Sequence, residues 1–227
     1  MPASTTLSGT EHTGADRAEK VWTGAGALTA DMPGLGHRIG VLAVQGAFAA
    51  HRNVLRRLGA DVVEVRTPAQ LSEVEAIVLP GGESTTISMM LRFNELLQPL
   101  RSAIVKGGLP TLGTCAGMIV LASEILDGRD DQECLGAIDI SVRRNAFGRQ
   151  VDSFEYDLPV NGMGDRPFPA VFIRAPVVTS VGPDVEVLAS IGDEPVLCRQ
   201  GRVLVAAFHP ELSGDDRLHR HLIDLLR

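Results

Sequence analysis

One cysteine of this 227-residue sequence lies where a strand-like segment turns into a helix-like one. In PTLGTCAGM, residues 110–118, Cys115 has Gly113 and Gly117 two positions away on either side. An abrupt strand-to-helix turn strains the backbone of its corner residue and exposes the side chain, and glycines beside it avoid clashes of Cβ atoms. The helix N-terminus offers unpaired N–H groups to a developing oxyanion. A small buried cysteine is the alternative, but the flanking glycines favour a nucleophile.

A thiol nucleophile needs a base, and His209 is the best placed of the six histidines. It follows the strand-like segment RVLVAAF and precedes Pro210, which puts it at the carboxyl end of a strand. Glu211 is two residues further on and is expected to orient the imidazole. The other histidines lie in or beside the N-terminal segment, in a helix, or in the polar C-terminal segment: His12, His37, His51, His219 and His221. HPE alone also fits a plain loop start, but with the cysteine corner it predicts nucleophilic catalysis.

Strand-like and helix-like segments alternate from Arg38 onward. Strands are predicted over residues 38–46, 60–67 and 109–115, with another ending at Pro80. Helices are predicted over 47–59, over 88–108 with a break near Pro99, and over 116–126. The remainder is β-rich over 135–145, 169–178, 185–192 and 194–210, with a closing helix from about Asp215. This alternation of apolar strands and helices predicts an α/β fold of three layers, with a mostly parallel central sheet flanked by helices.

Ligands of open α/β sheets bind beyond the carboxyl ends of the strands. Four loops of this sequence fall there, and we expect them to meet at one site. They are Gln45-Gly46, Gly81-Gly82-Glu83-Ser84, Cys115-Ala116-Gly117 and His209-Pro210-Glu211.

Composition excludes several classes of protein. A net charge of −7 gives no basic footprint for nucleic acid or for an anionic membrane surface. The longest apolar runs are too short to span a bilayer. The three cysteines lack the spacing of metal ligands or of a disulfide framework. We therefore expect a soluble cytoplasmic enzyme without a metal or another cofactor.

The first 36 residues differ from the rest. They are rich in Gly, Ala, Thr and Ser, without hydrophobic periodicity and without the pattern of a secretory signal. They are predicted to form a disordered extension of a single domain spanning 37–227. A partner-binding arm around Val21 and Trp22 is the alternative.

The motifs resemble a known family. GTCAG followed far along the chain by HPE is similar to the class I (triad-type) glutamine amidotransferases. VLPGGESTT, GTCAGM, RRNAFGRQVDSFE, VFIRAP and FHPEL, in this order, resemble more closely the glutaminase subunits of pyridoxal 5′-phosphate synthase. The resemblance runs from about Ile39 to the C-terminus. It implies a flavodoxin-like fold, hydrolysis of L-glutamine to L-glutamate and ammonia, and a large complex with a synthase (lyase) subunit that uses the ammonia.

The resemblance also assigns roles. Cys115 would attack the carboxamide carbon, with His209 as base and then acid, and Glu211 as its orienter. The oxyanion would lie against the Gly81-Gly82 turn and Ala116. Further substrate contacts are implied for Glu83 (α-ammonium) and Arg144 (α-carboxylate), and for Ser84, Ile173 and Arg174.

Two of these residues also fit a purely structural role. Glu83 also suits the N-terminus of a helix, and Arg144 also suits a solvated strand face. Gln45 and Gly46 are expected at the mouth of the site, where a docking partner would press on the Gly81-Gly82 peptide. Gln45 alternatively ends a strand with its amide in solvent.

Two other functions remain open at this stage. A glutaminase of another route, such as imidazole glycerol phosphate synthesis, would share the triad but should lack RRNAFGRQVDSFE. An inactive relative with a structural or regulatory role would be expected to have lost Cys115, His209 or Glu211. A glutamine hydrolysis assay with the partner synthase would separate these alternatives.

Overall fold

The computed structural model describes residues 32–144 and 153–227. The first 31 residues of the predicted extension, with Val21 and Trp22, and most of the RRNAFGRQVDSFE motif lie outside the described residues.

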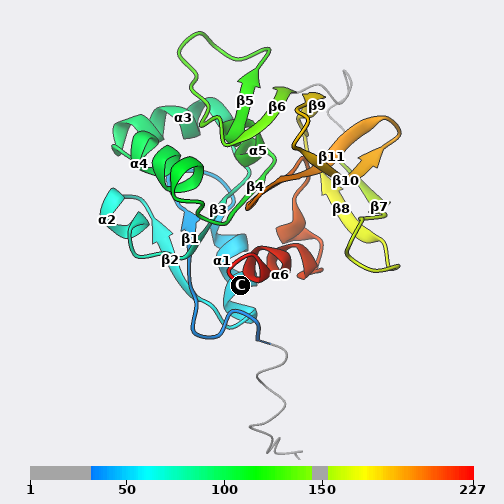
Figure 1. Ribbon diagram of the computed structural model, residues 1–227, viewed down its shortest axis with the longest axis horizontal. Helices are drawn as coiled ribbons and strands as arrows, with labels where there is room; N and C mark the ends of the chain where they lie inside the picture. Colours follow the sequence, from blue (N-terminus) through cyan, green and yellow to red (C-terminus); the bar gives the residue numbers. More distant parts are fainter. Residues whose placement is uncertain (1–31, 145–152) are drawn as a thin grey trace, which may run out of the picture.

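A seven-stranded sheet forms the centre of the molecule (Figure 1). Its strand order is β10-β11-β12-β4-β3-β1-β2, in which the five strands from β12 to β2 run parallel and β11 runs antiparallel to both of its neighbours, β10 and β12. The bounds are β1 Arg38–Leu42, β2 Asp61–Val65, β3 Ala76–Leu79, β4 Thr111–Thr114, β10 Glu186–Ile191, β11 Glu194–Gln200 and β12 Val203–Ala206. β3, β4 and β12 are buried along their whole length, as expected of parallel strands covered on both faces.

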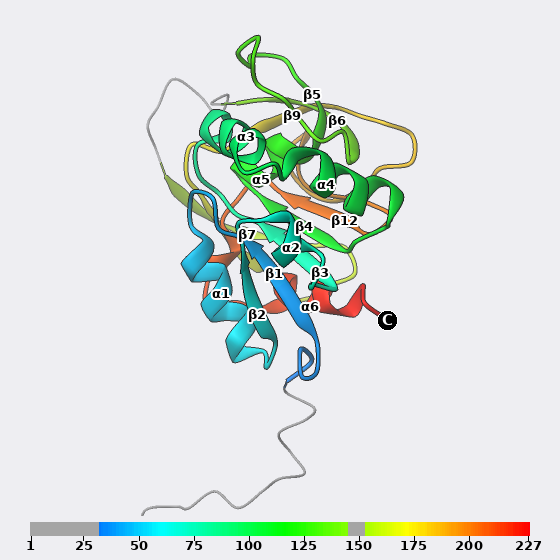
Figure 2. The ribbon, with the colours of Figure 1, turned by 90° about the vertical axis from the view of Figure 1, so that its left-hand side faces the viewer.

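Helices cover the sheet on both sides. α1 (Phe48–Arg57) and α6 (Arg217–Asp224) lie on one side, and α3 (Ser84–Phe93), α4 (Leu97–Arg101) and α5 (Ala116–Leu121) on the other (Figures 1 and 2). A short α2 (Pro68–Leu71), a π-helical turn at Ser102–Lys106 and a 3₁₀ turn at Pro210–Leu212 complete the helical elements of the described chain. The three-layer, mostly parallel α/β architecture confirms the predicted fold class.

Two small sheets flank the central one. The first has the order β5-β6-β9, with β5 Ala122–Ile125, β6 Ile138–Arg143 and β9 Val177–Val181. The second is the antiparallel pair of β7 Phe154–Leu158 and β8 Phe168–Phe172. Phe168 and Phe172 pack against Phe208, which ties this pair to the end of β12.

The helix predicted over 116–126 is wrong in its second half. α5 ends at Leu121, and Ala122 takes an extended conformation (φ −55°, ψ 160°) that starts β5. The backbone N–H groups of residues 135–137 bond to the carbonyls of residues 120–122, and β5 pairs with β6. Good helix formers are thus drawn into a strand by partners distant in sequence.

The helix break predicted near Pro99 is also misplaced. The chain breaks between Phe93 and Leu97, where Glu95 has a left-handed φ of 58°. Pro99 lies in the first turn of α4, where its missing N–H group has no helical acceptor to lose.

Residues 32–36, the last five of the predicted extension, contact the domain. Gly34 is buried, and its N–H donates to the carbonyl of Leu58 at 2.9 Å. Residues 32–36 thus pack against the predicted domain.

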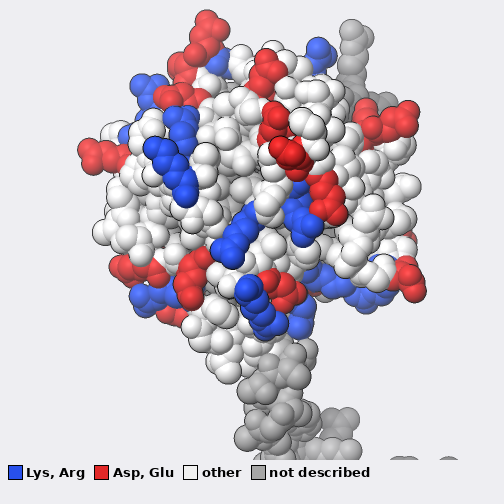
Figure 3. Space-filling model, viewed as in Figure 1, with Lys and Arg blue, Asp and Glu red and all other residues white. Residues whose placement is uncertain are grey.

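Charges of both signs alternate over the face shown in Figure 3, among the described residues. Within the described part of the chain, no helix is long and apolar enough to cross a membrane.

Candidate functional site

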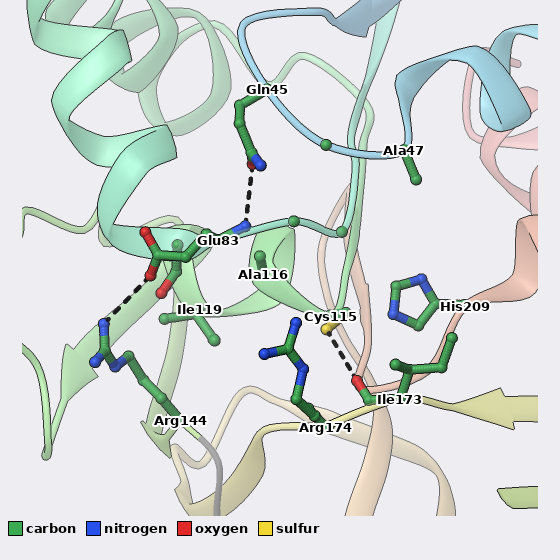
Figure 4. A pocket seen from close by; sticks show the side chains of 14 residues that line it. Gln45, Ala47, Glu83, Cys115, Ala116, Ile119, Arg144, Ile173, Arg174 and His209 are labelled. Carbon is green, nitrogen blue, oxygen red and sulfur yellow. Dashed lines mark hydrogen bonds and ion pairs between the residues drawn. The ribbon is translucent and has the colours of Figure 1, made fainter. Parts of the chain in front are cut away.

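One cavity of about 390 Å³ opens at the carboxyl ends of the central strands (Figure 4). All of the residues predicted for the site line it except Glu211, which lies behind His209. The lining also includes two residues that were not predicted, Ala47 and Ile119; the full set is Gln45, Gly46, Ala47, Gly81, Gly82, Glu83, Ser84, Cys115, Ala116, Ile119, Arg144, Ile173, Arg174 and His209.

Cys115 occupies the corner between β4 and α5 in a strained conformation, with φ 49° and ψ −105°. The flanking glycines are required by space. A Cβ atom on Gly117 would lie 2.0 Å from the carbonyl oxygen of Leu79, and one on Gly113 would lie 2.4 Å from Leu121 Cδ1. The corner is therefore the strained turn that its sequence predicts. The thiol is 7% exposed, and Sγ lies 3.9 Å from the carbonyl oxygen of Ile173.

His209 follows β12, as predicted, and its ring lies beside Cys115 (Figure 4). Its Nδ1 lies 2.8 Å from Glu211 Oε1. Burial lowers the pKa of His209, but the hydrogen bonds and charges of Cys115 and Glu211 outweigh that effect and raise the pKa to about 10. The site thus stabilises an imidazolium at His209.

Glu211 is 9% exposed and lies in the 3₁₀ turn after Pro210. Burial alone would raise the pKa of this carboxyl, but the contacts with His209 and His51 and the charge of His209 lower it well below its ordinary value of 4.5. The side chain is therefore an acceptor for the imidazole of His209.

The Gly81-Gly82 turn packs directly against the cysteine and histidine. A Cβ atom on Gly81 would lie 2.5 Å from His209 Cε1 and 3.4 Å from Cys115 Cβ, so only glycine fits there without a shift. The Gly81 carbonyl accepts a hydrogen bond of 2.9 Å from the Ala47 N–H, which fixes the present orientation of this peptide.

Glu83 caps the N-terminus of α3, which is the structural role that the sequence also allowed for it. Its carboxylate accepts hydrogen bonds from the N–H groups of Thr85 (3.1 Å) and Thr86 (2.6 Å). These hydrogen bonds lower the pKa of Glu83 against the opposing effect of burial. The side chain is 55% exposed and borders the cavity, and Oε1 lies 3.8 Å from Arg144 NH1.

Arg144 follows β6 and faces the cavity instead of lying on a solvated strand face (Figure 4). Its guanidinium donates to the Thr85 hydroxyl and, at 2.9 Å, to Gln132 Oε1. Gln132 in turn donates to the Ser84 hydroxyl at 3.0 Å. Thr85 and Gln132 thus hold Arg144 in place. Sequence reasoning missed both. Thr85 lies in the VLPGGESTT motif but was given no role, and Gln132 lies in none of the motifs.

Ile173 and Arg174 follow β8, on the side of the cavity opposite Gln45 and Ala47 (Figure 4). The His209 N–H donates to the Val171 carbonyl at 2.8 Å, which joins this segment to the loop after β12. Arg174 adopts a left-handed φ of 45° and projects into the cavity.

Gln45 lies at the mouth of the cavity and is not a solvated strand end. Its Oε1 accepts a hydrogen bond of 3.0 Å from the Glu83 N–H, and a Cβ atom on Gly82 would lie 2.2 Å from this oxygen. Gly46 has a φ of 95°, and a Cβ there would lie 2.0 Å from the Gly81 oxygen.

Across residues 32–144 and 153–227, no group of three or more His, Cys, Asp or Glu side chains is arranged to hold a metal ion. The three cysteines are free.

The sequence is similar to a known family and to named relatives. The model of the SNO glutamine amidotransferase family matches residues 41–226. A protein of Frankia alni, named pyridoxal 5′-phosphate synthase subunit PdxT, is 57% identical over 192 residues, which cover 85% of this chain and 96% of that protein. A protein of Mycobacteroides abscessus with the same name is 56% identical over 83% of this chain and 97% of its own length.

Two solved structures are similar to this chain in fold. A crystal structure described as a glutamine amidotransferase is 50% identical, with a TM-score of 0.79, over 83% of this chain and 98% of that one. A putative GMP synthase subunit from Thermoplasma acidophilum is 19% identical over 84% of this chain and 94% of its own, with a TM-score of 0.61, and it shares the fold.

Proposed function

This chain belongs to the SNO glutamine amidotransferase family, and we propose that it hydrolyses L-glutamine through a thioester on Cys115 and delivers the ammonia to a pyridoxal 5′-phosphate synthase subunit. The observation that carries the proposal is the strained Cys115 corner facing His209, whose imidazole is held by Glu211. The names of the relatives support a pyridoxal 5′-phosphate synthase subunit as the partner, and not an enzyme of imidazole glycerol phosphate synthesis. The presence of all three side chains argues against an inactive relative.

The first step forms the thioester. His209 takes the thiol proton, Cys115 Sγ attacks the carboxamide carbon, and the resulting oxyanion lies against the N–H of Ala116 and the Gly81-Gly82 turn. Protonated His209, stabilised by Glu211, then gives its proton to the leaving nitrogen as ammonia departs. Formation of the bond between Sγ and the carboxamide carbon removes the negative charge of the thiolate, one of the contributions that raise the pKa of His209. The imidazolium is thereby a better acid when ammonia leaves.

The second step releases glutamate. Neutral His209 takes a proton from water, whose oxygen attacks the thioester carbon. The C–S bond breaks, and the proton returns to the sulfur of Cys115. Glutamate leaves with a new C–O bond in place of the C–N bond, and the chain returns to its starting state.

Substrate recognition is assigned to the other side of the cavity. The α-ammonium would pair with Glu83, and the α-carboxylate would pair with the guanidinium of Arg144, whose fork matches two carboxylate oxygens. Ser84, Ile173 and Arg174 complete the glutamine site. No cofactor is needed for this chemistry.

The synthase partner is proposed to switch the glutaminase on. Docking at Gln45 and Gly46 would turn the Gly81-Gly82 peptide, and the Ala47 N–H bond to the Gly81 carbonyl is what must break for this to happen. One oxyanion donor gained in this way is worth about 3 kcal/mol, or about a hundredfold in rate. Free hydrolysis would waste glutamine and release ammonia into water, where it is protonated. We propose one glutaminase domain acting in a large cytoplasmic complex.

The test measures glutamate release with and without the synthase subunit, and transfer of ¹⁵N from the amide of labelled glutamine into pyridoxal 5′-phosphate. We expect both to require the synthase. Equal rates of glutamate release in the two conditions would rule out the switch, and absence of label from the product would rule out this partner. Gln45→Ala is expected to weaken the activation; activation as complete as in wild type would clear Gln45 of any role.

A further inference from the structure

Two fully buried histidines lie behind Glu211, on the side away from His209. His51 comes from α1 and His219 from α6, and both are 0% exposed. They are 168 residues apart in the chain. The proposed hydrolysis uses neither of them.

The polar atoms of these side chains form a row. Glu211 directs Oε1 to His209, while Oε2 lies 3.2 Å from His51 Nε2. The same nitrogen lies 3.1 Å from the Thr114 hydroxyl, and the opposite ring nitrogen of His51, Nδ1, lies 2.9 Å from His219 Nε2. Among the described residues, Oε2 of Glu211 has no hydrogen bond of regular geometry, so its contact with His51 Nε2 is a close approach between two buried polar atoms.

Counting ring protons defines the tautomers. A carboxylate only accepts hydrogen bonds, so a bare Nε2 on His51 would set two lone pairs against each other in a buried place. His51 avoids this repulsion when it carries its proton on Nε2. Its Nδ1 is then an acceptor, and His219 must donate from Nε2.

The far nitrogen of His219 agrees with this count. Nδ1 of His219 is buried and has no partner among the described residues. A bare nitrogen is tolerated there better than an N–H, because buried donors without an acceptor are the rarer case in proteins. Burial lowers the pKa of His219 well below its ordinary value, so this ring is neutral and has one proton to place.

We propose that His51 is a positioning residue for the hydrolysis, which holds the second carboxylate oxygen of Glu211 through Nε2–H, and that His219 fixes the tautomer of His51 that makes this possible. The inference rests on the proposed function. A glutamate carboxylate rotates easily about its last bond, and rotation would take Oε1 away from His209. Holding Oε2 keeps the acceptor aimed at the base before substrate arrives.

Packing alone does not explain these residues. Apolar side chains would fill the same space between α1, α6 and β4 without the cost of burying four ring nitrogens. The row instead ends on the carboxylate that orients His209.

The first experiment reads the tautomers directly. NMR of the full chain labelled with ¹³C and ¹⁵N in histidine gives the protonation of each ring nitrogen, with His51→Gln and His219→Gln used to assign the signals. We expect His51 and His219 both to carry their proton on Nε2. An Nδ1–H tautomer or an imidazolium at His51 would overturn the proposal. This result does not depend on glutaminase activity, so it stands apart from the proposed function.

The second experiment measures glutamate release with the synthase subunit, per active site titrated by 6-diazo-5-oxo-L-norleucine at Cys115. His51→Leu is expected to lower kcat about tenfold with KM unchanged, near the low end of the cost of losing a partner that orients a catalytic ligand. His51→Gln, which restores an N–H at the position of Nε2, is expected to recover most of kcat.

His221→Gln is the matched control. His221 is on the same helix as His219, and its electrostatic neighbours are Arg199, Asp224 and Glu186, so kcat should not change. A wild-type kcat in both His51 variants, or a loss in His51→Gln as large as in His51→Leu, would overturn the positioning role. A wild-type enzyme that releases no glutamate would instead refute the proposed function and leave the NMR result to decide this inference.

Discussion

The two walls of the cavity are built in different ways. On one wall, Cys115 is buried, the side chains of His209 and Glu211 are 10% and 0% exposed, and all three residues follow the buried strands β4 and β12. On the other, the side chains of Glu83 and Arg144 are 55% and 21% exposed. Glu83 is the N-cap of α3, and Arg144 is the first residue after β6 of a flanking sheet.

The difference matches the two tasks that we propose. Bond breaking needs groups held within a fraction of an ångström, which buried strand ends provide. Recognition of the charged end of an amino acid needs strong, bidentate contacts that still exchange with water when the product leaves. We therefore expect changes on the buried wall to lower kcat, and changes on the exposed wall to raise KM.

The largest effect is expected at the nucleophile. Cys115→Ala should abolish pyridoxal 5′-phosphate formation from glutamine but leave formation from added ammonium intact, because the carbon chemistry lies on the partner. Product formation from each nitrogen source is the measurement. Cys134→Ala, a half-buried cysteine outside the cavity, is the control and should behave as wild type. Wild-type glutamate release by Cys115→Ala would refute the assignment.

A smaller but still large effect is expected at the carboxylate of the buried wall. Glu211→Gln keeps the shape and removes the charge that stabilises the imidazolium of His209, so kcat should fall on the order of 10²-fold or more while KM changes less. Steady-state glutamate release with the synthase tests this. Glu186→Gln is the control. It removes a carboxylate on β10 that pairs with Arg199 on β11, and it should leave kcat unaltered. An unaltered kcat in Glu211→Gln would return Glu211 to an ordinary loop acid.

The exposed wall should respond in KM. Arg144→Leu removes a charge-assisted pair worth about 1.5–3 kcal/mol, which corresponds to a rise in KM of about 10- to 100-fold with little change in kcat. Arg143→Leu, at the adjacent exposed position on β6, is the matched control and should not alter KM. If Arg144→Leu lowers kcat as strongly as Glu211→Gln does, the division between the walls is wrong.

Sequence alone predicts the buried wall better than the exposed one. The Cys115 corner is predictable because Gly113 and Gly117 are a local signature of a steric requirement, which the 2.0 Å approach of a Gly117 Cβ to Leu79 bears out. His209 is predictable because an apolar strand ends just before it. The alternation of strands and helices predicts the parallel sheet in the same way.

Features that depend on distant partners were not predictable. β5 forms because residues 135–137 and β6 capture its backbone, and helix propensity says the opposite. Thr85 and Gln132 acquire a role only once Arg144 reaches them. His51 was assigned to a helix and His219 to a polar terminus, since contact between them joins positions far apart in the chain. The order of strands in the sheet has no local signal either.

The smallest effect concerns stability and again separates the walls. His219 is buried as the neutral ring, because burial and the charge of Arg57 lower its pKa against the opposing effect of Glu211. Below its ordinary pKa of 6.5 the unfolded chain binds a proton at His219 that the folded chain does not. The free energy of unfolding must then fall as the pH falls from 6.5, by at most about 1.4 kcal/mol per pH unit for one proton.

His219→Leu should therefore flatten the decline in unfolding free energy between pH 6.5 and 4.5, measured by urea titration at several pH values. The window stops at 4.5, the ordinary pKa of Glu211, because the lowered pKa of that carboxyl adds a loss of its own below this point. His209 adds no slope here, since its pKa is raised and it is protonated in both states below 6.5. His221, whose pKa is also lowered, still contributes to the slope in the variant, so the slope should shrink without vanishing.

Arg144→Leu on the exposed wall is the control. It removes a group that does not titrate in this range, and its curve should run parallel to wild type. A His219→Leu curve parallel to wild type would show that the ring behind Glu211 is not buried as the neutral form.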